Sequence, residues 1–167
     1  MSTNKKLIIM CGPAGSGKTT WVQDHASAGV SAHISRDRIR FDMLQPGEHY
    51  FSREDDVYAE FVKQVAQALT SPWVNEVYAD ATHLTEQARM KLVYCVDRKL
   101  PQGFTYDLMA VAIIPPVEVA IQRNAQRTGR ACVPETVIRN MYNSFEDPWD
   151  DENLSYTNVI YGEEGGT

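Results

Sequence analysis

The sequence predicts an α/β protein in which helices flank a mostly parallel sheet of five strands. Segments with strand character alternate with segments of helical spacing along the 167 residues, which is typical of a parallel sheet with crossover helices. The first apolar run, residues 6–10, is continuous, as expected for a strand that is covered on both faces. A glycine-rich turn follows it directly. We therefore expect a three-layer fold whose ligand crevice lies at the carboxyl ends of the strands.

The other elements follow from their local patterns. The longest predicted helix, residues 53–70, carries the stripe Val57, Phe61, Val65 and Leu69 at helical spacing. Thr85 is a suitable N-cap for a later helix. The remaining predicted strands are 30–34, 74–79, 105–114 and 157–161, and the remaining predicted helices are 18–28, 36–44, 85–99, 117–126 and one that starts at Pro134. We expect one domain over residues 1–167, with a lid at about 123–133 and a flexible tail at 162–167.

Composition and charge exclude several classes of protein. The longest apolar runs, 7–11 and 109–116, are too short to span a bilayer, and we expect a cytoplasmic protein without membrane contact. The three cysteines (11, 95 and 132) suit neither a disulfide framework nor a zinc site. A net charge of −6 argues against wrapping a long duplex, but it allows a local basic patch that holds a strand end.

Residues 12–19 contain the pattern Gly-x-x-x-x-Gly-Lys-Ser/Thr between a predicted strand and a predicted helix. The glycines allow positive φ, so that backbone N–H groups and the following helix N-terminus surround an anion. Lys18 is expected to reach the β- and γ-phosphates, and Thr19 is expected to bind Mg²⁺. We therefore predict a P-loop NTPase whose ATP·Mg²⁺ site comprises Gly12, Pro13, Ala14, Gly15, Ser16, Gly17, Lys18, Thr19 and Thr20.

Residues after the second strand suggest a binding site for a molecule that accepts the phosphate. Asp37 follows this strand at the expected crevice, where its carboxylate can take a proton from an attacking hydroxyl. Arg40 lies three residues later and can bind a phosphate on the acceptor. The alternative is that Asp37 only caps a helix whose arginines are solvated. The third strand ends at Asp80 with no following glutamate, which argues against a motor ATPase, and no Asn-Lys-x-Asp motif for guanine is present.

A basic segment follows the fourth strand and resembles a lid. Arg123 and Arg127 are four residues apart at the end of a predicted helix and are therefore expected to share one face of it, and Arg130 follows. Such arginines can neutralise phosphate charge during transfer. The alternative is a solvated helix end, which the helix dipole favours in any case.

Together, residues 12–21, 34–40, 123–127 and 133–142 resemble the 5′-kinase domain of phage and bacterial polynucleotide kinases, and Ala79-Asp80-Ala81-Thr82 resembles that family's third motif. The resemblance implies transfer of the γ-phosphate of ATP to the 5′-OH end of DNA or RNA. The implied roles are phosphate and Mg²⁺ binding by Lys18 and Thr19, general base catalysis by Asp37, acceptor-phosphate binding by Arg40, acceptor or metal organisation by Asp80 with Thr82, and contacts to the donor phosphates by Arg123 and Arg127.

Two other readings stay open. One is a kinase of a small metabolite such as a sugar or nucleoside, or a toxin-like kinase, which suits the negative charge better. The other is a nucleotide-dependent ATPase switch without an acceptor. Four aromatic residues around Pro46-Gly47 bear on this choice, because they can either stack on bases or belong to the core: Phe41, Tyr50, Phe51 and Tyr58.

Overall fold

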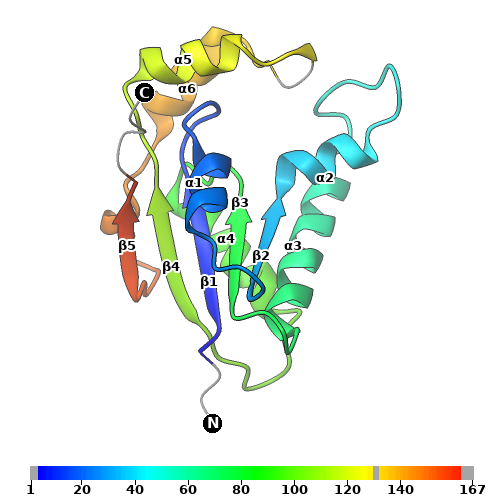
Figure 1. The fold of residues 1–167 in the computed structure, drawn as a ribbon, viewed down its shortest axis with the longest axis vertical. Helices are drawn as coiled ribbons and strands as arrows, with labels where there is room; N and C mark the ends of the chain where they lie inside the picture. Colours follow the sequence, from blue (N-terminus) through cyan, green and yellow to red (C-terminus); the bar gives the residue numbers. More distant parts are fainter. Residues whose placement is uncertain (1–3, 130–131, 163–167) are drawn as a thin grey trace.

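The fold is built on a five-stranded sheet, and the computed structural model describes residues 4–129 and 132–162 (Figure 1). The strands are β1 (Lys6–Cys11), β2 (Ser31–Ser35), β3 (Glu76–Asp80), β4 (Asp107–Ala112) and β5 (Asn158–Tyr161). They lie in the order β2-β3-β1-β4-β5, and each neighbouring pair is parallel. The predicted α/β fold with a parallel sheet is therefore confirmed.

The helices lie close to the predicted segments but are mostly shorter. They are α1 (Lys18–His25), α2 (Arg36–Met43), α3 (Glu54–Thr70), α4 (Glu86–Asp97), α5 (Val117–Ala125) and α6 (Glu135–Ser144), followed by the 3₁₀ helix η2 (Pro148–Asp150), which was not predicted. The predicted helix 18–28 ends at His25, because Ala26 adopts an extended conformation before Ser27 and Gly29, which are poor helix formers. Thr85 caps α4 as predicted, since its side chain accepts a hydrogen bond from the Ala88 N–H.

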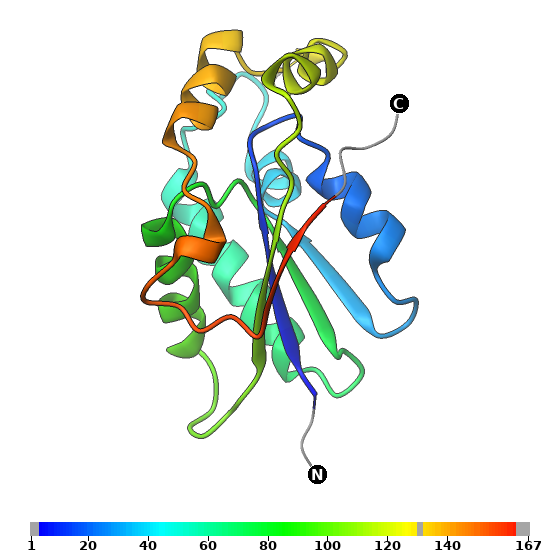
Figure 2. The same ribbon diagram turned by 90° about the vertical axis from the view of Figure 1, so that its left-hand side faces the viewer.

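The two faces of the sheet are covered unequally. Figure 2 shows α3 and α4 against one face and α1 against the other. The α3 stripe of Val57, Phe61, Val65 and Leu69 is fully buried, so that prediction is confirmed. On the α1 face, Val22 packs with a smaller apolar group that includes Ile8, Met10 and Tyr78. The main core therefore lies between the sheet and α3–α4.

A buried ion pair fixes the segment that leads into β5. The Arg89 side chain is fully buried, and its Nε lies 2.7 Å from Oδ2 of Asp151. The same guanidinium donates to the carbonyl oxygens of His83 and Glu146. Through these bonds α4 holds the chain on both sides of η2. The predicted tail beyond Gly162 and Arg130 of the predicted lid lie outside the described residues.

The carboxyl ends of the strands carry the phosphate loop. In Figure 1 the α2–α3 connection rises on one side of this loop, and α5 and α6 lie on the other side. None of the helices in residues 4–129 and 132–162 has both the length and the apolar character needed to cross a membrane.

Candidate functional site

The phosphate loop needs its glycines for space as well as for backbone conformation. A Cβ added to Gly12 would lie 2.4 Å from the carbonyl oxygen of Ile113. A Cβ added to Gly15, whose φ is +78°, would lie 2.5 Å from the carbonyl oxygen of Ala120. Both distances are below van der Waals contact, so the loop can pack against the residue after β4 and against α5 only with glycine at these positions. The predicted loop is thus built without side chains where its backbone passes its neighbours.

Lys18 lies inside this loop. The Lys18 side chain is buried, and its ammonium donates to the carbonyl oxygens of Gly12 (2.9 Å) and Pro13 (3.0 Å). Burial lowers the pKa of Lys18, while the charges of Asp80 and Asp37 oppose this change. The Ala14 N–H is directed at Sδ of Met141 at 3.4 Å, a weak acceptor that an anion can replace.

Asp80 connects the loop to the sheet. One of its oxygens, Oδ2, accepts hydrogen bonds from the Thr19 hydroxyl and from Nε2 of His33, each at 2.8 Å. Burial acts to raise the pKa of Asp80, but the hydrogen bond from His33, the charge of Lys18 and the bond from Thr19 together hold it below its ordinary value. His33 was not predicted, because only the β2–β3 register brings it beside Asp80. The carbonyl oxygen of Thr82 accepts from the Gly12 N–H at 2.9 Å and so anchors the start of the loop.

A network of side chains faces the loop from α2 and α3. Arg40 donates to both oxygens of Glu54, from Nε at 2.5 Å and from Nη2 at 3.0 Å. Its Nη1 donates to Asp37 and, at 2.9 Å, to the Tyr50 hydroxyl, which itself donates to Oδ1 of Asp37 at 2.9 Å. Burial and the nearby Asp37 raise the pKa of Tyr50 to about 12, so this hydroxyl keeps its proton.

Glu54 was missed as a site residue, because the sequence shows it only as the first of three acidic residues at the start of a helix. Its carboxylate also accepts from Arg36 at 2.8 Å. The hydrogen bonds from Arg40 and Arg36 outweigh burial and lower the pKa of Glu54. Ser35 rather than Asp37 caps α2, since the Ser35 hydroxyl accepts from the Arg38 N–H. The alternative role of Asp37 as the helix cap is therefore wrong.

One cavity joins these groups. It has a volume of about 260 Å³. Lys18 and Thr19 line it from the loop, Asp80 from the end of β3, Thr82 from the segment after β3, and Asp37 and Arg40 from α2. Arg127 and Val133 line it from the opposite side. The side chain of Asp37 is 57% exposed, so its carboxylate is accessible from the solvent. The cavity therefore contains a cationic phosphate cradle and an accessible carboxylate.

The two predicted lid arginines take different positions. Helix α5 ends at Ala125, before Arg127, so the expected shared helical face does not exist. Arg123 instead donates to the carbonyl oxygen of Ser16 at 2.9 Å, behind the loop, whereas Arg127 lines the cavity. Asn124, next to Arg123, connects the end of α5 to Val133. Its side-chain amide donates to the Val133 carbonyl oxygen (2.6 Å) and accepts from the Val133 N–H (3.0 Å).

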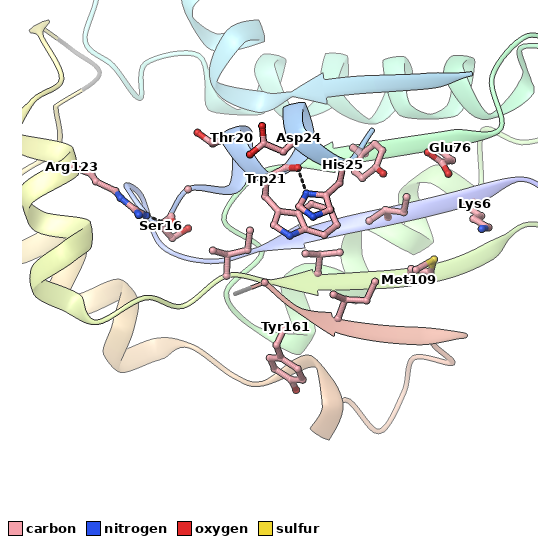
Figure 3. Close-up of a pocket in the computed structure, with 17 residues that line it drawn as sticks. Lys6, Ser16, Thr20, Trp21, Asp24, His25, Glu76, Met109, Arg123 and Tyr161 are labelled. Carbon is pink, nitrogen blue, oxygen red and sulfur yellow. Dashed lines mark hydrogen bonds between the residues drawn. The ribbon is translucent and has the colours of Figure 1, made fainter. Parts of the chain in front are cut away.

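A larger cavity of about 940 Å³ lies on the α1 face of the sheet (Figure 3). The stacked rings of Trp21 and His25, with centroids 3.9 Å apart, form part of its wall. Arg123 and Thr20 lie at its end near the loop. Neither Lys18 nor Asp37 lines it, so the candidate site is the smaller cavity.

Comparison with protein families identifies the family of this chain. A family model described as an AAA domain matches residues 7–148, which is most of the chain. The chain belongs to this family of AAA domains. A search of curated proteins finds no match to it.

Solved structures share the fold of this AAA domain at low sequence identity. A fungal RNA kinase is 15% identical with a TM-score of 0.64, and the match covers 98% of this chain and 76% of the kinase. A chain of the Pnkp1/Rnl/Hen1 RNA repair complex is 19% identical with a TM-score of 0.70, but this AAA domain covers only 48% of it, against 93% of its own length. A gluconokinase from Sinorhizobium meliloti 1021 is 16% identical with a TM-score of 0.56, covering 99% and 85% of the two chains. These likenesses show a P-loop kinase-like fold.

The residues of the AAA domain fit a nucleotide and its metal ion. The fold implies nucleotide binding, and the Ala14 N–H, directed at the weakly accepting sulfur of Met141, is a backbone donor that an anion can use. The Thr19 hydroxyl and the Asp80 carboxylate are adjacent oxygen donors, which is the pair that P-loop proteins use for Mg²⁺.

Proposed function

We propose that this AAA domain is an ATP-dependent kinase that transfers the γ-phosphate to the 5′-hydroxyl end of DNA or RNA. One observation carries the proposal: Asp37 lines the same cavity as Lys18 and Thr19 of the phosphate loop. A loop alone serves hydrolases and kinases equally, whereas a carboxylate facing it can activate a hydroxyl acceptor. The fungal RNA kinase and the RNA repair complex, which share the fold, support this choice.

Each donor-side residue has a role in this proposal. Lys18 leaves the carbonyl oxygens of Gly12 and Pro13 to bind the donor phosphates, and Arg127 stabilises charge on the transferred group from the other wall. Arg123 supports the phosphate loop through the carbonyl oxygen of Ser16, next to the proposed donor site. Thr19 and Asp80 would hold Mg²⁺, which supplies charge neutralisation at the phosphates when it is bound.

On the acceptor side, Asp37 takes the proton of the attacking hydroxyl. Its Oδ1 is occupied by Arg40 and Tyr50, while Oδ2 accepts no hydrogen bond from the described part of the chain and can take this proton. Arg40 both orients Asp37 and offers its remaining N–H to a phosphate next to the acceptor hydroxyl. Asp80 and Thr82 complete the floor between the two substrates.

The second candidate is a kinase of a small metabolite. A net charge of −6 and the small size of the cavity favour it, and a gluconokinase shares the fold. A nucleotide-dependent switch explains neither Asp37 nor its support by Arg40 and Tyr50.

The test is transfer of a labelled γ-phosphate from ATP to 5′-OH DNA and RNA oligomers, with nucleosides and gluconate assayed in parallel. We expect labelled oligomers with wild type, and a loss of about a thousandfold in Asp37→Asn, because the general base is removed. Asp42→Asn is the matched control, since Asp42 is an exposed aspartate of the same helix that does not line the cavity. Lys18→Ala is expected to abolish transfer to every acceptor. Labelling of gluconate or nucleosides alone would favour the second candidate, and equal losses in the two aspartate variants would remove Asp37 from the mechanism.

A further inference from the structure

The connection between α2 and α3 carries aromatic rings at the rim of the candidate site. Tyr50 and Phe51 line the cavity, and Phe51 is 51% exposed. Their rings are perpendicular with centroids 4.6 Å apart, and Phe41 meets Tyr50 edge-on at 5.9 Å. Tyr58 differs, because it packs against the main core beneath Arg36. The structure thus separates one core tyrosine from three rings that are grouped near the acceptor carboxylate.

This grouping is held in place before any ligand binds. The Phe51 N–H donates to Nδ1 of His49 at 3.3 Å, and the Ser52 N–H donates to the His49 carbonyl oxygen at 3.0 Å. Arg53 pairs with Glu48 across the same turn at 2.7 Å. Single exposed aromatic residues are common on protein surfaces, but a fixed, half-exposed ring at the mouth of a cavity provides a preorganised contact surface.

The charges on this side of the cavity are balanced. Arg36 and Arg40 are both paired with Glu54, and Arg40 also donates to Asp37. The four hydrogen bonds of Arg40 leave a single N–H of its guanidinium without a partner among the described residues. Arg40 therefore offers an acceptor at most one phosphate contact. Arg36, which also lines the cavity and donates one hydrogen bond to Glu54, offers a second, and the exposed surface that Phe51 adds at the rim is aromatic.

We propose that Phe51, supported by Tyr50, stacks on the first base of the acceptor, and that this stack rather than phosphate charge holds the strand end. The inference rests on the proposed function and adds the way in which the acceptor is recognised. Base stacking tolerates any sequence, because every base has a π face. Since the Tyr50 hydroxyl donates to Asp37, the stacked base also lies next to the group that takes the proton.

The experiment compares two 5′-OH oligomers, one with a normal first nucleotide and one whose first nucleotide lacks its base. With saturating ATP, we expect Phe51→Ala to raise KM for the normal oligomer roughly tenfold, and the abasic end to raise KM of wild type by a similar factor. When Phe51→Ala is assayed with the abasic oligomer, KM should rise no further, because the substitution and the missing base remove the same contact. Phe51→Trp should restore a low KM. Trp73→Ala is the control, since Trp73 is 80% exposed but does not line the cavity.

Salt dependence gives a second readout. With phosphate contacts limited to Arg40 and Arg36, KM of wild type should change by no more than about sevenfold between about 50 and 200 mM salt. A change of more than about tenfold would show that phosphate charge holds the acceptor and would overturn the proposal. An effect of Phe51→Ala that is equally large on the abasic oligomer would also overturn it, as would no effect on either oligomer. In each of these cases oligomers are still labelled, so the proposed function survives. If wild type labels no oligomer at all, the proposed function itself fails.

Discussion

The proposed donor and acceptor sides of the site are built in different ways. The donor side is one continuous stretch, residues 12–19, in which backbone groups line the cradle and glycines make room for it. The acceptor side draws Asp37, Arg40, Tyr50 and Glu54 from α2, a loop and α3, and it depends on hydrogen bonds between their side chains. Both sides open into one cavity.

This difference shows which substitutions each side tolerates. A phosphate-binding loop made of backbone groups is damaged by substitutions that its backbone conformation cannot accept, whereas its exposed side chains can vary. A side-chain network is damaged when one charge is removed, because the opposite charge then stays buried without its partner. Asp80 belongs to both designs, since it is bonded to Thr19 of the loop and to His33 of β2.

The largest effect on stability is expected from Gly15→Ala. The new Cβ would lie 2.5 Å from the Ala120 carbonyl oxygen at a φ of +78°, so overpacking adds to left-handed strain. We expect a loss of about 4 kcal/mol in the free energy of unfolding, together with weaker ATP binding.

Gly29→Ala is the matched control, because Gly29 has a similar φ of +81° but no neighbouring atom within 4 Å. It should cost about 1 kcal/mol and leave ATP binding intact. Urea unfolding and ATP titration measure both, and equal losses would show that packing against α5 is unimportant.

Glu54→Gln tests the acceptor side. The Arg40 side chain is only 7% exposed, and removing the charge of its main partner leaves the guanidinium buried beside Asp37 alone. We expect the free energy of unfolding to fall by about 3 kcal/mol and oligomer phosphorylation to fall with it. Asp55→Asn, an exposed change in the same first turn of α3, should cost less than about 1 kcal/mol. If both variants unfold at the same urea concentration, the network does not stabilise the fold.

The smallest expected effect on stability concerns His83, which contacts β1, the strand that leads into the phosphate loop. Burial lowers its pKa to about 4, although Nδ1 is hydrogen-bonded to the Met10 carbonyl oxygen, and the charge of Arg36 acts in the same direction as burial. The unfolded chain therefore binds a proton below pH about 6.5 while the folded protein does not, so stability is lost as pH falls from about 6.5 towards 4. Between pH 7 and pH 5 this loss is about 2 kcal/mol.

His83→Asn should remove that part of the pH dependence in urea unfolding curves. Asparagine tolerates the φ of +41° at this position, so the backbone need not change. His25→Asn, at an exposed position, should leave the pH dependence as it is in wild type. An unchanged pH dependence in His83→Asn would mean that another group titrates.

Much of the fold was predictable because its signals are local. The apolar run of β1, the stripe of α3 and the cap at Thr85 each depend on residues a few positions apart, and each was confirmed. Element ends were less accurate, as in α1, which stops at His25 where the next residue turns to extended backbone. The shared face of Arg123 and Arg127 was wrong for a related reason, since α5 ends before Arg127.

By itself, the sequence determined the phosphate loop and the two candidate residues Asp37 and Arg40, because their meaning depends on spacing within one turn or one helix. Only the tertiary structure decided what these residues touch. Glu54 is distant from Asp37 along the chain and reaches it through Arg40, and His33 meets Asp80 only because β2 and β3 pair in one register. The Asn124 side chain also meets Val133, which lies nine residues later in the sequence. Such contacts are set by the packing of helices on a sheet, which no short window of sequence contains.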